Sequence, residues 1–463
     1  MALWGWLPGN AFTPRGWGML AAGAASLAAA QVMGRRDLLA LAILLVLLPA
    51  VSLAGLRLAH PRFRVARTFT PSPVETSAPV TVHLRVARTG PGSGRAVMEE
   101  RLPARFGQSP SFRFPSRAAT GGTSRYEYRL RPSQRGQFRI GPVTAEFTDP
   151  FGLSLHRQAI DDGGTLTVTP AAVVLPRTVL AGARGDDGVT ATRSRAHPSD
   201  DDVMTREYRH GDPMRRVHWA ATARHGELMV RQEESLTTPV ATILLDLRAA
   251  AFPGGHHDDV LPTGSPAFEW AVVAAMSVSS HLAVRNHALR LMDQHGAPAF
   301  RHSPSAPEPE TEEYSGPAGL QAIAESLAAI QPAGGHREGT ERTLLRHADA
   351  ESPPAAFDDG VMDKLSAHRL RGPLVAVLGR ITAQEARALA PAAAYATTAV
   401  AVIATDAPAE AAGPLELLRA AGWRAVAAAP GTSPADAWAQ LDSGRAGPAK
   451  TGSDAHRSAG AGL

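Results

Sequence analysis

Two uninterrupted apolar runs open the chain, and each has the length of a membrane-spanning helix. Residues 17–34 contain no charge, and residues 38–56 are richer in leucine. A helix of about 20 apolar residues crosses the hydrocarbon core of a bilayer. The gap at residues 35–37 is so short that it predicts an antiparallel helical hairpin. Small residues spaced four apart in the first run predict a smooth face for close helix packing. They are Gly18, Ala22, Ser26 and Ala30.

A cleaved signal peptide is the competing interpretation of the first run, because the alanines at 28–30 resemble a cleavage region. The second, stronger run follows at once and favours a two-span anchor. Basic residues after the second run predict that the soluble body lies on the cytoplasmic side of a bacterial inner membrane. Arg35 and Arg36 at the hairpin tip favour the opposite orientation. The basic residues after the second run are Arg57, Arg62, Arg64 and Arg67.

The next hundred residues alternate apolar and polar positions, which is the period of a half-buried strand. Residues 80–88 and 124–132 show this alternation most clearly. Gly141-Pro142 and the Asp-Pro-Phe-Gly sequence at 149–152 supply turns between strands. Regular short strands without a helical period predict an antiparallel β-sandwich.

The pattern changes after Pro239, where strands become continuous apolar runs of the kind buried on both faces of a sheet. These runs lie at residues 240–247, 373–379 and 398–405, and helical patterns alternate with them. Such alternation predicts a doubly wound, mostly parallel sheet. An acidic stretch at 303–317 and the Gly/Ala/Ser-rich tail are predicted to be disordered.

The predicted fold class is a membrane-anchored protein with two N-terminal transmembrane helices, an antiparallel β-sandwich and an α/β domain. We expect six parts: a transmembrane hairpin at 1–59, the β-sandwich at 60–180, a flexible connector at 181–202, a signature β-element at a domain junction at 203–238, the α/β domain at 239–442 and a disordered tail at 443–463.

Composition and missing motifs exclude several kinds of chemistry. The chain has no cysteine, which removes disulfides, thiolate metal sites and cysteine nucleophiles. A formal net charge of +4 is small for 463 residues and does not suggest a nucleic-acid partner. Glycine-rich nucleotide loops, a Gly-x-Ser-x-Gly elbow and a His-Glu-x-x-His motif are all missing from the sequence. We therefore expect no cofactor and no enzymatic activity.

Asp246 is the best metal candidate, because it follows the first buried strand, where open α/β sheets bind ligands. A cation there would need hydroxyl ligands two and four residues later, but Arg248 and Ala250 occupy those positions. We expect Arg248 to pair with Asp246 and the metal site to be degenerate. The His/Asp-rich loop at 254–260 is expected to be a solvated loop, since adjacent residues rarely converge on one ion.

The segment 204–231 is the densest in charge, and its alternation predicts three short strands around a Gly211-Asp212 turn. Three interpretations remain open. Trp219 plugs a domain junction stabilised by arginine–carboxylate pairs; or the surplus arginines bind an acidic partner, such as an envelope polymer; or Asp212 orients His218 as the acid/base pair of a hydrolase.

This segment resembles the signature of the bacterial domain-of-unknown-function family numbered fifty-eight. The Arg-Gly, Gly-Pro and Asp-Pro-Phe-Gly series at 135–152 and the two apolar spans also resemble that family. The signature positions, with their possible role in partner binding, are Arg206, Tyr208, Gly211, Asp212, Arg215, Trp219, Thr222, Ala223 and Arg224.

The resemblance implies a von Willebrand A-like α/β domain after the signature. It also implies two partners, a MoxR-type AAA+ ATPase and a transglutaminase-like membrane protein. The implied role is that of a membrane-tethered adaptor or co-chaperone in envelope or complex assembly. An ATPase in the cytoplasm agrees with the predicted cytoplasmic body.

Overall fold

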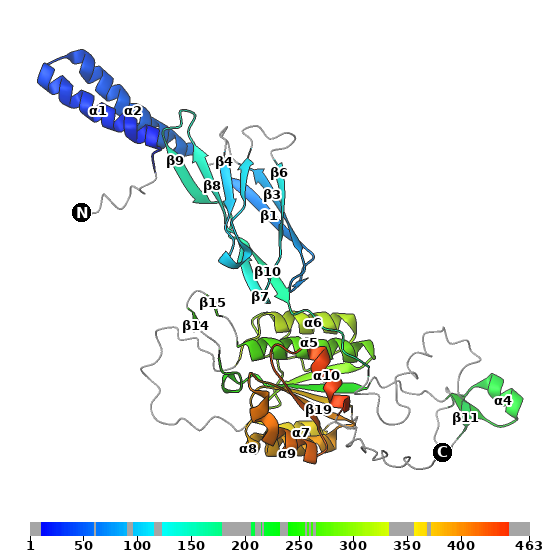
Figure 1. Ribbon diagram of the computed structural model, residues 1–463. Coiled ribbons are helices and arrows are strands. Elements are labelled where there is room, and N and C mark those ends of the chain that lie inside the picture. Colours follow the sequence, from blue (N-terminus) through cyan, green and yellow to red (C-terminus); the bar gives the residue numbers. More distant parts are fainter. Residues whose placement is uncertain are drawn as a thin grey trace, which may run out of the picture. The chain divides into compact units, whose positions relative to one another are not determined.

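The computed structural model describes the chain in two compact units, Met1–Pro170 and Ala171–Leu463 (Figure 1). The described residues are 11–59, 62–89, 96–114, 123–177, 205–208, 214, 217–231, 239–254, 257–258, 261–262, 265–332, 356–367 and 372–443. The predicted connector at 181–202 and all but the first residue of the predicted tail lie outside this set.

Two long antiparallel helices open the first unit, α1 at Pro14–Met33 and α2 at Arg36–Ala59 (Figure 1). Thr13 caps α1, because its side-chain oxygen accepts a hydrogen bond from the Gly16 amide at 3.2 Å. Both helices are long and apolar enough to cross a membrane, and only 17% and 11% of their apolar windows are buried. These features are consistent with membrane anchoring. A third helix of suitable length, Pro266–Val284, is 67% buried and forms part of the α/β core.

The packed face of α1 differs from the predicted one. Gly16, Gly23 and Ala30 are its buried residues, whereas Gly18 and Ala22 are exposed. The buried positions lie seven residues apart, which is the sequence repeat of contact positions in two helices that coil around one another. A Cβ on Gly23 would lie 2.8 Å from Cγ2 of Val46, so the close approach requires glycine there. The prediction that small residues line the packed face of α1 is correct, but they lie seven residues apart and not four.

The rest of the first unit consists of β-strands in three sheets, with mostly antiparallel pairing. One sheet has the order β1-β3-β6, another β2-β10-β7 and the third β5-β4-β8-β9. Their apolar side chains form two clusters, and β3 contributes Val80 and Val82 to one and Leu84 and Val86 to the other. The strands are β1 Phe63–Thr70, β2 Val74–Glu75, β3 Val80–Arg88, β4 Ala96–Glu100, β5 Ser111–Phe114, β6 Thr123–Leu130, β7 Gly136–Ile140, β8 Val143–Thr148, β9 Leu155–Ala159 and β10 Gly164–Thr169.

A buried ionic network lies inside this unit. Arg67 Nε donates to Glu100 Oε1 at 2.5 Å, and Arg67 Nη2 lies 3.0 Å from Asp161 Oδ2. The Tyr128 hydroxyl donates to Glu100 Oε2 at 2.6 Å. Burial and this contact with the Glu100 carboxylate raise the pKa of Tyr128. Because the Arg67 side chain is only 5% exposed, it does not belong with the exposed basic residues used to predict topology.

The second unit contains a six-stranded sheet of order β17-β16-β13-β18-β19-β20, parallel except for the edge strand β17 (Figure 1). Residues of α5, α6 and α10 pack in one apolar cluster, and those of α7, α8 and α9 in another. The elements are β13 Val240–Leu245, α5 Pro266–Val284, β16 Ala288–Asp293, β17 Glu313–Tyr314, α6 Gly316–Ala328, α7 Asp359–Ala367, β18 Leu374–Leu378, α8 Ala383–Leu389, β19 Ala399–Ala404, α9 Ala412–Ala420, β20 Arg424–Ala428 and α10 Pro434–Ser443.

The acidic stretch at 303–317 is ordered, so the prediction of disorder there is wrong. Ser303 Oγ donates to the Ser326 carbonyl at 2.6 Å. Tyr314 is 5% exposed and pairs with Leu289 across the β17–β16 ladder. Composition alone suggested a solvated insertion, but Ser303 and the edge-strand residue Tyr314 both attach the segment to the core.

Removal of the Glu100 carboxylate tests the buried network. We expect Glu100→Gln to lower the free energy of unfolding by about 3 kcal/mol, near the lower end for a broken buried ion pair, because Asp161 still faces Arg67. Glu99→Gln is the matched control. Glu99 pairs with Arg157 on the surface, where an ion pair contributes about 1 kcal/mol or less. Denaturant unfolding of the full chain in detergent measures both values, and equal losses would contradict the burial argument.

Candidate functional site

The carboxyl edge of the parallel sheet holds the strongest candidate site, centred on Asp246 directly after β13. The Asp246 side chain is fully buried, and the Arg248 side chain is 18% exposed. Arg248 Nε donates to Asp246 Oδ1 at 2.9 Å, and Arg248 Nη2 donates to Asp246 Oδ2 at 2.7 Å. This two-point contact matches the planar guanidinium to the carboxylate. The pair expected from the spacing of two residues is therefore present.

Further contacts fix the Arg248 guanidinium from two other elements. Its Nη1 donates to Glu385 Oε1 of α8, and its central carbon lies 5.3 Å from the centre of the Phe357 ring. Glu385 is itself held in a capping box with Thr382, at the beginning of α8. The Arg248 guanidinium is therefore held by the carboxylates of Asp246 and Glu385 and by the face of the Phe357 ring. Each of these contacts is favourable for a positive charge.

Opposing effects act on the protonation of Arg248. Burial lowers its pKa, but the hydrogen bond to Asp246 and the charges of Asp246 and Glu385 raise it by more, so that the net shift is upward. The guanidinium consequently stays charged, and it occupies the place beside Asp246 that a metal ion would need. Gly379, at the end of β18, approaches closely as well, because its amide donates to Asp246 Oδ2 at 3.4 Å.

Among the described residues, Glu385 is the other carboxylate that contacts Arg248, and both carboxylates are paired with that guanidinium. Ala250 lies in the short 3-10 helix Ala249–Ala251 and has no oxygen side chain. In the described part of the chain, no group of three or more His, Asp or Glu side chains could hold an ion. In the His/Asp loop, His257–Asp258 and Leu261–Pro262 pair as a short hairpin, β14 and β15. Residues 255, 256, 259 and 260 lie outside the described set.

The signature segment folds as a compact β–α–β element. Strand β11 (Thr205–Glu207) pairs antiparallel with β12 (Met229–Arg231), and the helix α4 (Trp219–His225) lies between them in the chain. The prediction of a second strand through Trp219 is wrong. Ala-rich sequence favours helix, and both ends of α4 are capped. His218 Nδ1 accepts from the Ala221 amide at 3.1 Å, and Gly226 takes the left-handed conformation that ends the helix.

The side chains of this element separate into a small core and an exposed face. Val217 and Val230 are buried, and Thr222 Oγ1 accepts a hydrogen bond from the Met229 amide at 3.0 Å. Trp219 is 66% exposed, and Arg224 is also exposed. Tyr208 is half-buried. Gly211, Asp212 and Arg215 lie outside the described residues, as does the side chain of Arg206.

The helix cap bears on the hydrolase interpretation. Because His218 Nδ1 accepts an amide hydrogen bond, a neutral ring carries its proton on Nε2. An orienting carboxylate would then have to approach Nε2, which would leave no ring nitrogen free to act as a base. Asp212 lies outside the described residues. The described geometry therefore gives His218 a structural role at the start of α4.

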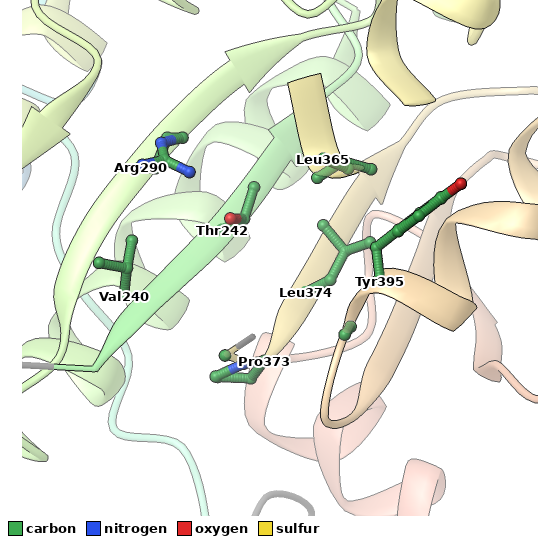
Figure 2. Close-up of a pocket in the computed structure, with 9 residues that line it drawn as sticks. Val240, Thr242, Arg290, Leu365, Pro373, Leu374 and Tyr395 are labelled. Carbon is green, nitrogen blue, oxygen red and sulfur yellow. The ribbon is translucent and has the colours of Figure 1, made fainter. Parts of the chain in front are cut away.

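A small pocket lies at the opposite, amino-terminal edge of the α/β sheet, between the beginnings of β13 and β18 (Figure 2). It is lined by Val240, Thr242, Arg290, Leu365, Gly372, Pro373, Leu374, Tyr395 and Ala396. Arg290 is paired with Glu313. Ligands of open α/β sheets bind at the carboxyl ends of the strands, so this pocket is not the expected place for a ligand.

Comparison with known proteins agrees with the sequence pattern. The described residues give a protein with an apolar helical hairpin, a β unit and an α/β unit in which Arg248 pairs with the buried Asp246. Residues 204–257 match the family described as "Protein of unknown function DUF58", which confirms the resemblance to that family. This match spans the signature element, β13 and Asp246. No curated protein matches the chain.

Two solved structures show weak similarity. The PKD domain of an M14-like peptidase from a Thermoplasmatales archaeon is 12% identical, with a TM-score of 0.14 over 24% of this chain and 96% of that one. The alkylpurine DNA glycosylase AlkC of Pseudomonas fluorescens, bound to DNA with an abasic site analogue, is 12% identical with a TM-score of 0.14, over 28% of this chain and 38% of that one. Scores this low carry no argument about fold or function.

Truncation of Arg248 tests whether the guanidinium compensates the buried carboxylate. We expect Arg248→Ala to lower the free energy of unfolding by about 3–5 kcal/mol, because Asp246 remains as a buried, unpaired charge. The double variant Asp246→Asn with Arg248→Met removes both charges and should recover much of that loss. Arg380→Ala is the control, since Arg380 pairs with Glu410 at the surface. A loss no larger than that of Arg380→Ala would contradict the role of Arg248.

Proposed function

We propose that this protein is a membrane-tethered adaptor that binds a protein partner without a metal ion and catalyses no reaction itself. The observation that carries the proposal is the Arg248 guanidinium beside Asp246. It places a cationic side chain, held by the carboxylates of Asp246 and Glu385, at the carboxyl edge of the sheet. A site built in this way holds no exchangeable cation and presents its surface to a partner directly.

We further propose a von Willebrand A-like fold for the second unit and a sandwich for the β unit. The first is supported by the parallel sheet with one antiparallel edge strand, by helices from both apolar clusters and by an acidic residue after the first strand. The second is supported by the antiparallel sheets whose apolar faces share two clusters.

A MoxR-type AAA+ ATPase is the partner that we propose, with a transglutaminase-like membrane protein as a second component of the same assembly. The signature element supports a binding role, because Trp219, Arg224 and Met214 are exposed on it. Tryptophan and arginine dominate the energies of protein interfaces. Their exposure in a segment with its own small core is consistent with a surface that a partner covers.

Binding by the signature element is tested on the full chain in detergent. We expect the wild type to bind a MoxR-type ATPase in the presence of nucleotide. Trp219→Ala and Arg224→Ala should each weaken binding about tenfold or more, because a residue central to an interface contributes about 2 kcal/mol. Unfolding free energies should change by no more than about 0.5 kcal/mol, since both side chains are exposed.

The exposed arginine of β6, Arg129, supplies the control, and Arg129→Ala should leave binding unchanged. If the wild-type chain does not retain the ATPase with or without nucleotide, the proposal that this ATPase is the partner is wrong. Equal loss in Arg224→Ala and Arg129→Ala, with Trp219→Ala unchanged, would show that binding depends on charge in general and not on the signature element.

We propose a cytoplasmic body at a bacterial inner membrane. With Arg67 buried, Arg57, Arg62 and Arg64 remain as the basic residues after α2, against Arg35 and Arg36 at the hairpin tip. The balance still favours the cytoplasmic side for the body. Protease added to intact spheroplasts should leave the body undigested, whereas lysed spheroplasts should yield fragments. Digestion from outside would reverse the orientation.

A further inference from the structure

The Asp-Pro-Phe-Gly turn at 149–152 is rigid and presents an aromatic side chain to its surroundings. Asp149 is 6% exposed. Its carboxylate accepts hydrogen bonds from the amides of Phe151 at 3.1 Å, Leu153 at 2.7 Å and Ser154 at 2.7 Å. Burial raises the pKa of Asp149, but the hydrogen bonds from Ser52 and these amides lower it by more. The ionised carboxylate holds the turn closed, and Phe151 at its tip is 63% exposed.

The turn is attached to both helices of the hairpin. Thr13 Oγ1 donates to the Gly152 carbonyl at 2.6 Å, and the Thr13 amide donates to the Leu153 carbonyl at 3.0 Å. On the other helix, Ser52 Oγ donates to Asp149 Oδ2. A Cβ on Gly16 would lie 2.1 Å from the Leu153 carbonyl oxygen, so the first turn of α1 approaches this loop as closely as glycine allows.

These contacts place the turn where the apolar part of the hairpin begins. Helix α1 begins at Pro14, and its uncharged run begins at Trp17. Ser52 lies seven residues before the end of α2 at Ala59, or about 10 Å along the helix axis at 1.5 Å per residue. A bilayer that surrounds the apolar parts of α1 and α2 would therefore have its headgroup region at the level of residues 149–152.

The side chains around the turn have the character of a membrane interface. Trp17 is 49% exposed, and its ring lies edge-on to Phe12 at 5.7 Å. Arg15 Nη1 is close to the turn, 3.9 Å from the position of a Cβ on Gly152. Tryptophan is enriched at headgroup level, phenylalanine is among the residues that anchor interfacial segments in the acyl boundary, and basic side chains near the surface are attracted to anionic lipid headgroups. Phe151 extends this belt from the helices onto the β unit.

We propose that residues 149–152 form a second membrane contact, in which Phe151 enters the interfacial layer and Arg15 binds the phosphate of an anionic lipid. This contact holds the β unit at the bilayer surface instead of leaving it on a flexible tether. The inference rests on the membrane anchoring of α1 and α2 that the proposed function includes. A lipid bilayer is the occupant that the continuity with those helices favours.

The absence of cysteine from the sequence allows a clean test by site-directed labelling. Single cysteines are placed by Phe151→Cys, Leu44→Cys and Val97→Cys in the full chain. Each carries an environment-sensitive fluorophore, in vesicles of phosphatidylcholine with or without phosphatidylglycerol. Leu44 is exposed within α2, and Val97 is exposed on β4, so they serve as the membrane and solvent controls. Lipids with quenchers at headgroup or deep acyl positions report the depth of each label.

We expect the label at 151 to be quenched more strongly from the headgroup position than from the deep position, and the label at 97 to be quenched by neither. Phosphatidylglycerol should increase quenching at 151, and Arg15→Gln should remove that increase. Quenching at 44 without quenching at 151 would overturn this contact while leaving the anchor intact. No quenching at 44 would overturn the membrane anchor itself. A blue-shifted but unquenched label at 151 would indicate cover by protein and would also overturn the lipid contact.

Discussion

Buried carboxylates that must be compensated are the constraint on which both units depend. Glu100, Asp149 and Asp246 are all nearly or fully buried, and an uncompensated charge in such a place costs several kcal/mol. Glu100 is paired with Arg67, Asp149 accepts hydrogen bonds from backbone amides and Ser52, and Asp246 is paired with Arg248. These contacts also join elements of the fold. The contacts of Glu100 join strands of the β unit, and those of Asp149 join the turn to the helical hairpin. Arg248 joins the end of β13 to α8.

The pairing of Asp246 with Arg248 determines the chemistry at the carboxyl edge of the α/β sheet. Parallel sheets bind ligands at the carboxyl edge because the loops there are free to converge. Here Arg248 brings a permanent positive charge to that edge, and Glu385 and Phe357 fix its position. Both oxygens of the Asp246 carboxylate are therefore contacted by the protein's own side chain.

The predictions failed where a local pattern had two meanings. Residues 217–223 alternate in a way that fits a strand, but their alanines also fit a helix, and the caps at His218 and Gly226 decide for α4. The stretch at 303–317 has the composition of a solvated loop, yet Tyr314 anchors it. Arg67 was counted among the basic residues that set the membrane topology, although it shares the inward positions of β1 with Phe63, Val65 and Phe69. That alternation was the signal that could have revealed it.

The sequence by itself determined the two apolar spans, the buried strands of the α/β unit, the missing catalytic motifs and the Asp246–Arg248 pair. All of these depend on run length, period or a spacing of two residues, which are local properties of the chain. Only the tertiary structure decided the partners of Glu100 and Asp149 and the contact between Arg248 and Glu385. Those partners are separated by 33, 97 and 137 residues. Such pairs form only when folding brings distant segments together, and no local pattern records which charges will meet.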